Sequence, residues 1–511
     1  MDIREVAVIG LGTMGAGIAE VFARAGIGVV AIEADPQAMT HGLGLLDASL
    51  SKAVSRGKLS ASEQAQTRAR IRPAAGFSDA AAVDLAIEVV PERTEIKRQI
   101  FAELDRVTSP AAILATNTSS LSVTAIAAAT KHPGRVVGMH FFNPAPVMRL
   151  VEVVSTVITD DGVADAVAEL ARRLGKTPVQ VSDRAGFVAN ALLLPYLNES
   201  IELLEIGYAS REDIDMAATA GIGLPMGPLA LLDLIGLDTA LSIMEVLHAE
   251  FGLTRYAPAP LLRRLVDAGR TGRKAGRGIY DYVTSASDSA GNGVSSSPPD
   301  TVTLIGSGDD AETDLATALA SAGVNVTRNA AHPTELVLIA ATAGRPVLPA
   351  ALAAGRPEQS VGLHLPRGLT RGRLAELIHT SLSSDKAIGA AAALADKLGL
   401  QVVRAPDRPG FLVGALLYPH LADAVRMVQD GYATAADVDT AMMLGCGYPQ
   451  GPFELLDAAG PSIVLAGLRA MQDAYGFPSL APPVLLAEHA AAGIQWASKR
   501  GGPEIRSGGG G

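Results

Sequence analysis

Short apolar runs alternate with amphipathic stretches along the first third of the chain, as in a sheet whose strands are joined by helices. An apolar run covers residues 3–9, a helical pattern covers 13–25, and a second apolar run covers 28–33. Further strand-like runs follow, with helical patterns between several of them: Leu85–Val90, Ile113–Ala115, Val136–Met139 and Leu150–Val154. This alternation predicts a doubly wound α/β domain of the Rossmann type.

After Asp183 the pattern changes to long helical runs. These runs are Ala189–Ile206, Arg211–Ala220, Leu229–Phe251 and Ala259–Ala268. They predict a separate all-α domain, which ends before a run from Thr284 to Asp300 that is rich in Ser, Gly, Pro and Asp and has no apolar periodicity. Such a composition is typical of a flexible linker.

The two sides of this linker repeat each other at one spacing. Gly138-Met139-His140 corresponds to Gly362-Leu363-His364, and 364 − 140 is 224. The same shift relates Glu152 to Glu376, Gly186-Phe187 to Gly410-Phe411, Gly207-Tyr208 to Gly431-Tyr432, Asp215 to Asp439, and Pro225, Gly227, Pro228 and Asp233 to Pro449, Gly451, Pro452 and Asp457. A run of this length without a gap indicates an internal duplication.

Upstream of this run the spacing changes, because Gly306 corresponds to Gly10 and 306 − 10 is 296. The second copy is therefore shorter by 296 − 224, or 72 residues. We predict a Rossmann domain with a helical arm at 1–183, a helical domain at 184–283, a linker at 284–300, a truncated Rossmann-like domain at 301–406 and a second helical domain at 407–500. The second half is thus a shortened, degenerate repeat of both domains.

Composition narrows the class of function. The 511 residues are 48% hydrophobic and 19% charged with a net charge of −11, which argues against broad binding to nucleic acid or to an anionic membrane. We find no apolar stretch of ~18 residues, and the mixed-charge start lacks a signal-peptide pattern, so we expect a cytoplasmic protein. The single cysteine, Cys446, excludes an internal disulfide or a thiolate metal cluster within one chain, and we predict no metal site.

The clearest motif is Gly10-Leu11-Gly12-Thr13-Met14-Gly15, directly after an apolar strand and at the start of a helix. In a dinucleotide fold the first glycine makes the turn, the second lets the backbone approach the pyrophosphate, and the third allows close helix–strand packing. The next strand ends at Glu33, about twenty residues on, where a carboxylate binds the ribose hydroxyls and repels a 2′-phosphate. We therefore predict NAD as the cofactor, with Asp35 close enough to share the role of Glu33.

Two further segments carry candidate chemistry. His140 closes one predicted strand and Glu152 lies in the next, within GMHFFNPAPVMRLVE at 138–152. A carboxylate bonded to one ring nitrogen fixes the tautomer and leaves the other nitrogen to take a proton. Asn117-Thr118-Ser119-Ser120 follows another strand, at the edge of the sheet where ligands bind. Taken alone, a lone histidine is more often structural and a polar turn more often a helix cap.

Together these residues resemble the L-3-hydroxyacyl-CoA dehydrogenase family. The resemblance spans about residues 3–283, and it rests on Gly10 to Gly15, Asn117 to Ser120, HFFNPAPVM at 140–148, Leu150-Val151-Glu152-Val153, Gly186-Phe187-Val188 with Asn190, and Gly221 to Asp233. The two-part layout is similar to the long bacterial members, which include 3-hydroxyadipyl-CoA dehydrogenases of the phenylacetate pathway.

The resemblance implies NAD-dependent oxidation of an (S)-3-hydroxyacyl-CoA thioester, in fatty-acid or aromatic degradation. It implies that His140 is the general base, that Glu152 orients it, and that Ser119 and Asn190 bond the reacting oxygen and the thioester region. The implied cofactor contacts are Gly10, Gly12, Thr13, Met14, Gly15, Glu33, Glu92, Lys97, Asn117, Asn143 and Lys274. Ser49 and Arg56 lie where the arm of the family contacts coenzyme A.

Two alternatives stay open at this point. One is the related branch of gulonate and crystallin-like dehydrogenases, which act on free small hydroxy acids, although HFFNPAPVM and the basic arm at 52–58 favour the thioester branch. The other is a binding or scaffold protein that only senses the cofactor. Leu224 and Leu229 stand where the family usually has Tyr and Phe, which leaves the shape of the acyl pocket open.

The second half lacks the full set of candidate residues. The 224 shift places Ala343 opposite Ser119 and Gly414 opposite Asn190, although His364 and Glu376 are retained. In its glycine motif Asp309 and Asp310 stand where pyrophosphate would approach the helix, so we expect no second NAD site. We predict instead that its helical part packs against the first helical domain as a pseudo-dimer within one chain.

Overall fold

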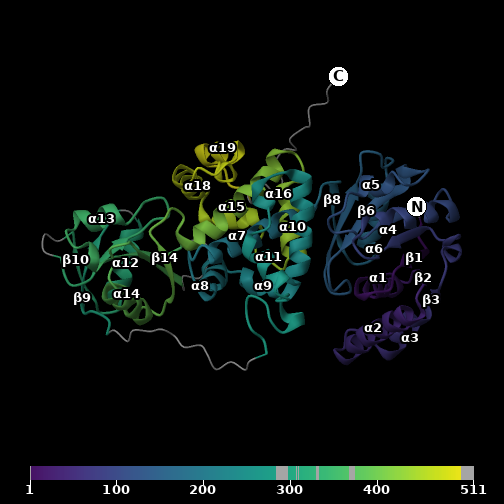
Figure 1. Ribbon diagram of the computed structural model, residues 1–511, viewed down its shortest axis with the longest axis horizontal. Helices are drawn as coiled ribbons and strands as arrows, with labels where there is room; N and C mark the ends of the chain where they lie inside the picture. The colour runs from purple at the N-terminus through teal and green to yellow at the C-terminus, as the bar shows by residue number, and fades with distance from the viewer. Residues whose placement is uncertain are drawn as a thin grey trace, which may run out of the picture. The chain divides into compact units, whose positions relative to one another are not determined.

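The computed structural model describes residues 2–283, 297–306, 308, 310–329, 333–366 and 374–496. Most of the predicted linker and the Gly-rich C-terminal tail lie outside these ranges, as does Asp309. The chain forms two compact units (Figure 1). Unit 1 contains Met1–Ala191 together with Tyr432–Gly447, and unit 2 contains Leu192–Gly431 together with Tyr448–Gly511.

Unit 1 is built on an eight-stranded sheet in the order β3-β2-β1-β4-β5-β6-β7-β8. All neighbours pair in parallel except β6 and β7, which are antiparallel. The strands are β1 (Glu5–Ile9), β2 (Gly28–Ile32), β3 (Ile71–Ala74), β4 (Leu85–Glu88), β5 (Ile113–Thr116), β6 (Val136–Phe141), β7 (Leu150–Ser155) and β8 (Thr177–Ser182). The predicted Rossmann-type fold is confirmed, and β3 and β8 are strands that the hydrophobic pattern did not indicate.

Helices cover both faces of this sheet. They are α1 (Thr13–Arg24), α2 (Pro36–Ser55), α3 (Ala61–Ala69), α4 (Thr94–Val107), α5 (Val123–Ala127) and α6 (Val163–Arg173). Asp35 caps α2 by accepting from the backbone N–H groups of Gln37 and Ala38, and Ser60 caps α3. The helical arm predicted around residues 49–58 is thus the end of α2 and the turn that follows it.

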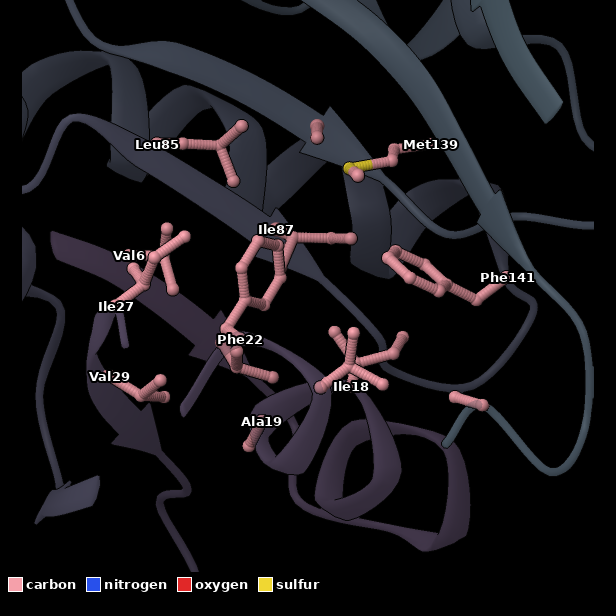
Figure 2. Close-up of a cluster of buried hydrophobic side chains, with 14 of the residues drawn as sticks. Val6, Ile18, Ala19, Phe22, Ile27, Val29, Leu85, Ile87, Met139 and Phe141 are labelled. Atoms are coloured by element: carbon pink, nitrogen blue, oxygen red, sulfur yellow. The ribbon is translucent and has the colours of Figure 1, made fainter. Parts of the chain in front are cut away.

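The strand residues that face α1 form one buried apolar cluster (Figure 2). Met139 and Phe141 belong to it, and the Phe141 ring meets the Phe22 ring of α1 at 6.3 Å between centroids. Successive side chains on a strand point to opposite faces. His140 and Glu152, which alternate with members of this cluster, therefore point to the other face of the sheet.

Unit 1 also contains a segment from the second half of the chain. Helix α16 (Ala435–Gly445) packs against β7 and β8, and just before it the Tyr432 hydroxyl donates to the Ser182 carbonyl at 3.2 Å. The predicted domain boundaries follow the sequence repeat, whereas the compact units cut across the predicted domain 407–500 at this segment.

Unit 2 contains most of α7 (Ala189–Glu205) and the helices that follow it: α8 (Arg211–Met216), α9 (Pro228–Ile235), α10 (Leu237–Phe251) and α11 (Pro260–Asp267). The helix predicted over 229–251 is wrong in its length, because the chain breaks at Gly236, where φ is +101°. A positive φ is costly for residues other than glycine, so the break requires this residue. The predicted helix 211–220 ends at Met216 and continues as a wider turn over Ala217–Ile222.

The second sheet lies in unit 2, in the order β10-β9-β11-β12-β13-β14. Its strands are β9 (Thr301–Ile305), β10 (Asn325–Arg328), β11 (Val337–Ala340), β12 (Ser360–His364), β13 (Leu374–His379) and β14 (Gln401–Pro406). By the two shifts these correspond to β1, β2, β5, β6, β7 and β8. The missing 72 residues are therefore α2, α3, β3, β4 and α4, which confirms the shortened repeat.

The remaining helices of unit 2 are α12 (Asp310–Ser321), α13 (Leu348–Ala353), α14 (Asp385–Lys397), α15 (Phe411–Gln429), α17 (Pro452–Ala459), α18 (Pro461–Tyr475) and α19 (Val484–Ala492). Within the described parts of the chain, α15 alone is long and apolar enough to cross a membrane. Since 83% of its most apolar window is buried inside the protein, it has the character of a core helix.

Candidate active site

The loop from Gly10 to Gly15, here called the glycine loop, joins β1 to α1. Gly10 has a φ of +92° and donates to the Ile32 carbonyl of β2, and a Cβ atom there would lie 2.9 Å from the Val89 carbonyl oxygen. A Cβ atom on Gly15 would lie 1.9 Å from the Gly10 carbonyl oxygen, whereas one on Gly12 would meet nothing within 4 Å. The N-terminus of α1 has no side-chain cap, so its N–H groups, including those of Thr13 and Met14, can donate hydrogen bonds to a bound anion.

Glu33 lies beside this loop at the end of β2. Its Oε2 accepts from the Leu11 backbone N–H at 3.1 Å, and its Oε1 accepts from the Asp35 backbone N–H at 3.3 Å. The Asp35 carboxylate is occupied as the cap of α2. Of the two acidic residues considered from the sequence, Glu33 is therefore the one whose carboxylate contacts the glycine loop.

His140 and Glu152 are paired directly across the antiparallel strands β6 and β7. The His140 Nδ1 lies 2.7 Å from the Glu152 Oε2, and the Glu152 side chain is fully buried. An ionised carboxylate only accepts hydrogen bonds, so Nδ1 carries the proton of a neutral imidazole and Nε2 is left as an acceptor. This arrangement can take one proton from a bound hydroxyl group.

The second oxygen of Glu152 is held by the chain that leads into α7. Its Oε1 accepts from the backbone N–H groups of Val188 and Ala189, both at 3.0 Å. Phe187, just before them, has a φ of +47°, a left-handed conformation that is costly for a bulky residue and that clusters at functional sites. The Gly186-Phe187-Val188 motif thus orients the two donors toward Glu152.

The turn after β5 is organised by Glu92. The Glu92 Oε1 accepts from the Thr118 hydroxyl at 2.5 Å, from the Ser119 backbone N–H at 2.8 Å and from the Ser120 backbone N–H at 3.1 Å. Burial acts to raise the pKa of Glu92, but Lys97 and these donors outweigh it and hold the pKa below its ordinary value. The Asn190 amide reaches the Ser119 carbonyl at 3.4 Å, which brings the two predicted polar residues together.

Lys97 and Asn117 make contacts within the protein. The Lys97 ammonium is buried between the carboxylates of Glu88, at 2.8 Å, and Glu92, at 3.2 Å. It therefore fixes the carboxylate of Glu92, which holds the turn after β5. The Asn117 Oδ1 accepts from the Phe141 backbone N–H at 2.8 Å, and this bond ties β5 to β6 beside His140. Their direct contact with the cofactor stays a prediction.

The other predicted residues are more widely spread. Ser49 lies on α2 and Arg56 caps its C-terminus, seven residues apart and so on one face of the arm. Asn143 is exposed just after β6. Lys274 belongs to unit 2, where its ammonium pairs with the Asp238 carboxylate at 2.6 Å.

Sequence reasoning missed two buried groups near the site. Glu88 forms an ion pair with Lys97. An acidic residue at the end of the apolar strand Leu85–Glu88 was the sequence feature that could have indicated this buried pair. Lys176 donates to the carbonyls of Ala145 at 2.5 Å and Met148 at 2.7 Å, and so holds the loop that follows His140. Burial lowers the pKa of Lys176 to about 8. Nothing in the local sequence pattern indicated that this lysine is buried.

The second half retains the pair but not its surroundings. The His364 Nδ1 lies 2.5 Å from the Glu376 Oε2, and the Glu376 Oε1 accepts from the Leu412 and Val413 backbone N–H groups. Among the described residues between β10 and β11, the shortened repeat has no helix equivalent to α4 and therefore no equivalents of Glu92 or Lys97.

The glycine motif of the second half is occupied by a carboxylate of the protein itself. The Glu312 Oε2 accepts from the Gly308 backbone N–H at 2.7 Å, and a Cβ atom on Gly306 would lie 2.5 Å from the same oxygen. The expectation named Asp309 and Asp310 for this role. Asp309 and the side chain of Asp310 lie outside the described residues, and Glu312 is the group that the described structure places there.

The glycine loop at an uncapped helix N-terminus, the acidic residue after β2 and the buried His–Glu pair define a dinucleotide-dependent oxidoreductase. A family model for the 3-hydroxyacyl-CoA dehydrogenase NAD-binding domain matches residues 5–184. The model for the 3-hydroxyacyl-CoA dehydrogenase C-terminal domain matches residues 186–282 and again 410–502. The chain therefore belongs to the 3-hydroxyacyl-CoA dehydrogenase family, and its helical domain occurs twice.

Relatives with one half and with both halves are similar to this chain. The 3-hydroxyadipyl-CoA dehydrogenase of Escherichia coli is 36% identical over 96% of this chain and 98% of that protein. The 3-hydroxybutyryl-CoA dehydrogenase of Mycobacterium tuberculosis is 48% identical over 55% of this chain and 99% of its own length. A crystal structure of 3-hydroxybutyryl-CoA dehydrogenase from E. coli covers 96% of this chain and 99% of its own, with a TM-score of 0.84 and 34% identity.

The chain is thus an NAD-dependent 3-hydroxyacyl-CoA dehydrogenase. Among the residues that the structure describes, no group of three or more His, Cys, Asp or Glu side chains could hold a metal ion.

Proposed function

We propose that His140 is the general base in the oxidation of an (S)-3-hydroxyacyl-CoA thioester of the 3-hydroxybutyryl or 3-hydroxyadipyl type. The observation that carries this proposal is the 2.7 Å contact between His140 and a Glu152 carboxylate that is itself held by two backbone N–H groups. NAD, when bound, accepts the hydride from C3. The Nε2 of His140 takes the proton of the C3 hydroxyl as the C–O bond becomes a carbonyl, and 3-oxoacyl-CoA leaves.

The remaining predicted residues have supporting roles in this proposal. Glu152 stabilises the imidazolium that forms, and Ser119 and Asn190 donate to the substrate oxygens. The uncapped N-terminus of α1 and Glu33 hold the dinucleotide, and Ser49 and Arg56 hold coenzyme A. A cytoplasmic location and a place in fatty-acid or phenylacetate degradation stay predictions.

We also propose that the two helical domains pack as a pseudo-dimer within one chain. Three contacts inside unit 2 support this: the Tyr196 and His420 rings lie 5.1 Å apart, the Tyr208 hydroxyl donates to the Phe411 carbonyl, and Arg255 pairs with Asp423. Since 196 + 224 is 420, Tyr196 meets its own equivalent in the repeat. A twofold-related pair of domains brings equivalent residues together in this way.

The test of the catalytic proposal is NADH oxidation with acetoacetyl-CoA and with 3-oxoadipyl-CoA. We expect His140→Ala to lose at least about 10²-fold in kcat, since general base catalysis contributes at that level, and to keep NADH binding. The matched control is His364→Ala, which removes the equivalent, partly buried histidine of the second half and is expected to keep wild-type kcat.

Equal turnover by wild type and His140→Ala would exclude the proposed base. Reduction of free acetoacetate as fast as its thioester would favour the alternative branch that acts on free hydroxy acids.

A further inference from the structure

The segment Tyr432–Gly447 comes from the second half of the sequence but belongs to the unit that contains His140. Two contacts hold its start: the Tyr432 hydroxyl donates to the Ser182 carbonyl of β8, and the Arg184 guanidinium lies 5.1 Å from the centre of the Tyr432 ring. Helix α16 then runs along β7 and β8. The strand that carries Glu152 is therefore covered by a helix from the degenerate half.

The end of this helix reaches the catalytic pair. A Cβ atom on Gly445 would lie 2.6 Å from the Leu150 Cδ2 and 3.1 Å from the Phe142 ring, so only glycine fits there without displacing them. The Phe142 ring in turn packs against the His140 imidazole at 4.5 Å between centroids. Leu150 is two residues before Glu152 on β7 and so points to the same face of the sheet.

The next residue, Cys446, also belongs to unit 1. Burial raises the pKa of its thiol, and the negative charge of Glu152 adds to the effect.

The same arrangement occurs in unit 2 with the halves exchanged. Gly221, which the 224 shift relates to Gly445, lies against Leu374 and Val413 of the second half, with 2.7 Å and 2.8 Å from its Cβ position to their methyl carbons. Tyr208 there donates to Phe411, and the Arg408 guanidinium lies 5.5 Å from its ring centre. Each helical domain thus supports the His–Glu pair of the other half, although Ala343 and Gly414 replace the polar partners of the pair in unit 2.

We propose that Gly445 is a positioning residue for the reaction in unit 1: it seats the Phe142 ring against His140 and packs against Leu150 on the strand that carries Glu152. The degenerate half is then a working part of the enzyme, because its α16 completes the catalytic unit. This inference rests on the proposed role of His140 as the base.

The test uses the full chain and two matched substitutions, Gly445→Val and Gly221→Val. Both force a branched side chain against packed apolar atoms, so both are expected to lower the thermal unfolding midpoint. Only Gly445→Val is expected to lower kcat, by at least about tenfold, since small displacements at a reacting centre cost that much. Its KM for NADH stays within about twofold, because the glycine loop is untouched.

The pH profile separates positioning from a general loss of stability. Displacing Phe142 admits water to the imidazole, and water favours its charged form. We expect the acid limb of kcat/KM to move to higher pH in Gly445→Val and to stay in place in Gly221→Val. If Gly445→Val does not fold, Gly445→Ala is measured instead, with an expected loss of about threefold in kcat and the same direction of shift.

Wild-type kcat and an unmoved pH profile in a folded Gly445 variant would overturn the inference. So would an equal loss of kcat in Gly221→Val, which would assign the effect to stability. If His140→Ala keeps its turnover, the proposed base is wrong, and that result is read independently of the Gly445 variants.

Discussion

Glu152 uses its two oxygens for different tasks. One accepts from His140, and the other accepts from two backbone N–H groups at the start of α7. Because the backbone bonds fix the carboxylate, the proposed mechanism has an imidazole that is oriented before substrate arrives, which is the usual function of the third member in a base assembly. Glu376 repeats both sets of bonds in a half that lacks the rest of the site. The pair is therefore also a structural link between a sheet and its helical domain.

Glu199 on α7 is the residue whose titration we expect to affect stability. Burial raises its pKa, and the carboxylates of Glu202 and Asp423 add to the effect, so that the pKa is about 8 instead of about 4.5. A carboxyl group with a raised pKa in the folded state binds its proton more tightly there than in the unfolded chain. Its contribution is present below pH 4.5 and is lost as the pH rises through about 8.

We therefore predict that Glu199→Gln loses less stability than wild type between pH 5 and pH 8.5. One pKa unit corresponds to about 1.4 kcal/mol, so the difference is expected to be at least of that size. Thermal unfolding midpoints at the two pH values measure it. Glu250→Gln, at an exposed position on α10, is the control, and parallel behaviour of the two variants would contradict the prediction.

At the scale of elements, α2 and the glycine loop are in direct contact. A Cβ atom on Gly42 of α2 would lie 2.1 Å from the Leu11 carbonyl oxygen, whereas one on Gly44 would meet nothing within 4 Å. Both glycines are inside the same helix, two residues apart. The contacted atom belongs to the backbone of the glycine loop, so it cannot rotate away as a side chain can. A change in the packing of α2 at Gly42 is therefore expected to displace the glycine loop.

This contact predicts opposite effects of two alanine substitutions. Gly42→Ala forces α2 and the glycine loop apart, and we expect a loss of about 1–3 kcal/mol in stability and of about tenfold in NADH affinity. Gly44→Ala improves helix propensity and gains up to about 1 kcal/mol with unchanged affinity. Denaturant unfolding and NADH fluorescence titration measure both. Equal effects of the two substitutions would show that the contact does not bear on the loop.

At the scale of the whole molecule, the duplication places in one chain what two copies of a single-half relative would supply. The match to the M. tuberculosis protein spans 99% of that relative but 55% of this chain. In the proposed pseudo-dimer the second half takes the place of a partner subunit. The contact of Gly445 with Leu150 of β7 agrees with this proposal. Glu312 occupies the glycine motif of the second half, which is consistent with a half that supports the first half and binds no dinucleotide of its own.

A chain shortened to residues 1–283 tests this assignment. It lacks α15 and α16, so we expect two copies to pair, with the segment around Gly221 of each copy taking the place of Gly445 in the other. Sedimentation equilibrium is expected to give a dimer, and activity per chain is expected to fall on dilution, while that of the full chain does not. A shortened chain that is monomeric and as active as the full chain would contradict the pseudo-dimer.

The sequence alone determined the features that depend on near neighbours along the chain. The glycine loop, the strand end at Glu33 and the ungapped repeat follow from local spacing, and the His140–Glu152 pair follows from two adjacent strands. Such features are set by backbone conformation and by a period of two along a strand. The break at Gly236 shows the limit of this reasoning, because a helical pattern continues across a residue whose conformation ends the helix.

Only the tertiary structure decided which distant segments meet. Lys176 holds the loop after His140 from 31 residues away, Glu312 fills a site assigned to other carboxylates, and Gly445 lies against Leu150 from the other half of the chain. These contacts arise from close packing between elements, which depends on where whole helices and sheets lie. Hydrophobic patterns record that a residue is buried but not which neighbour it meets, so these contacts appear first in the folded chain.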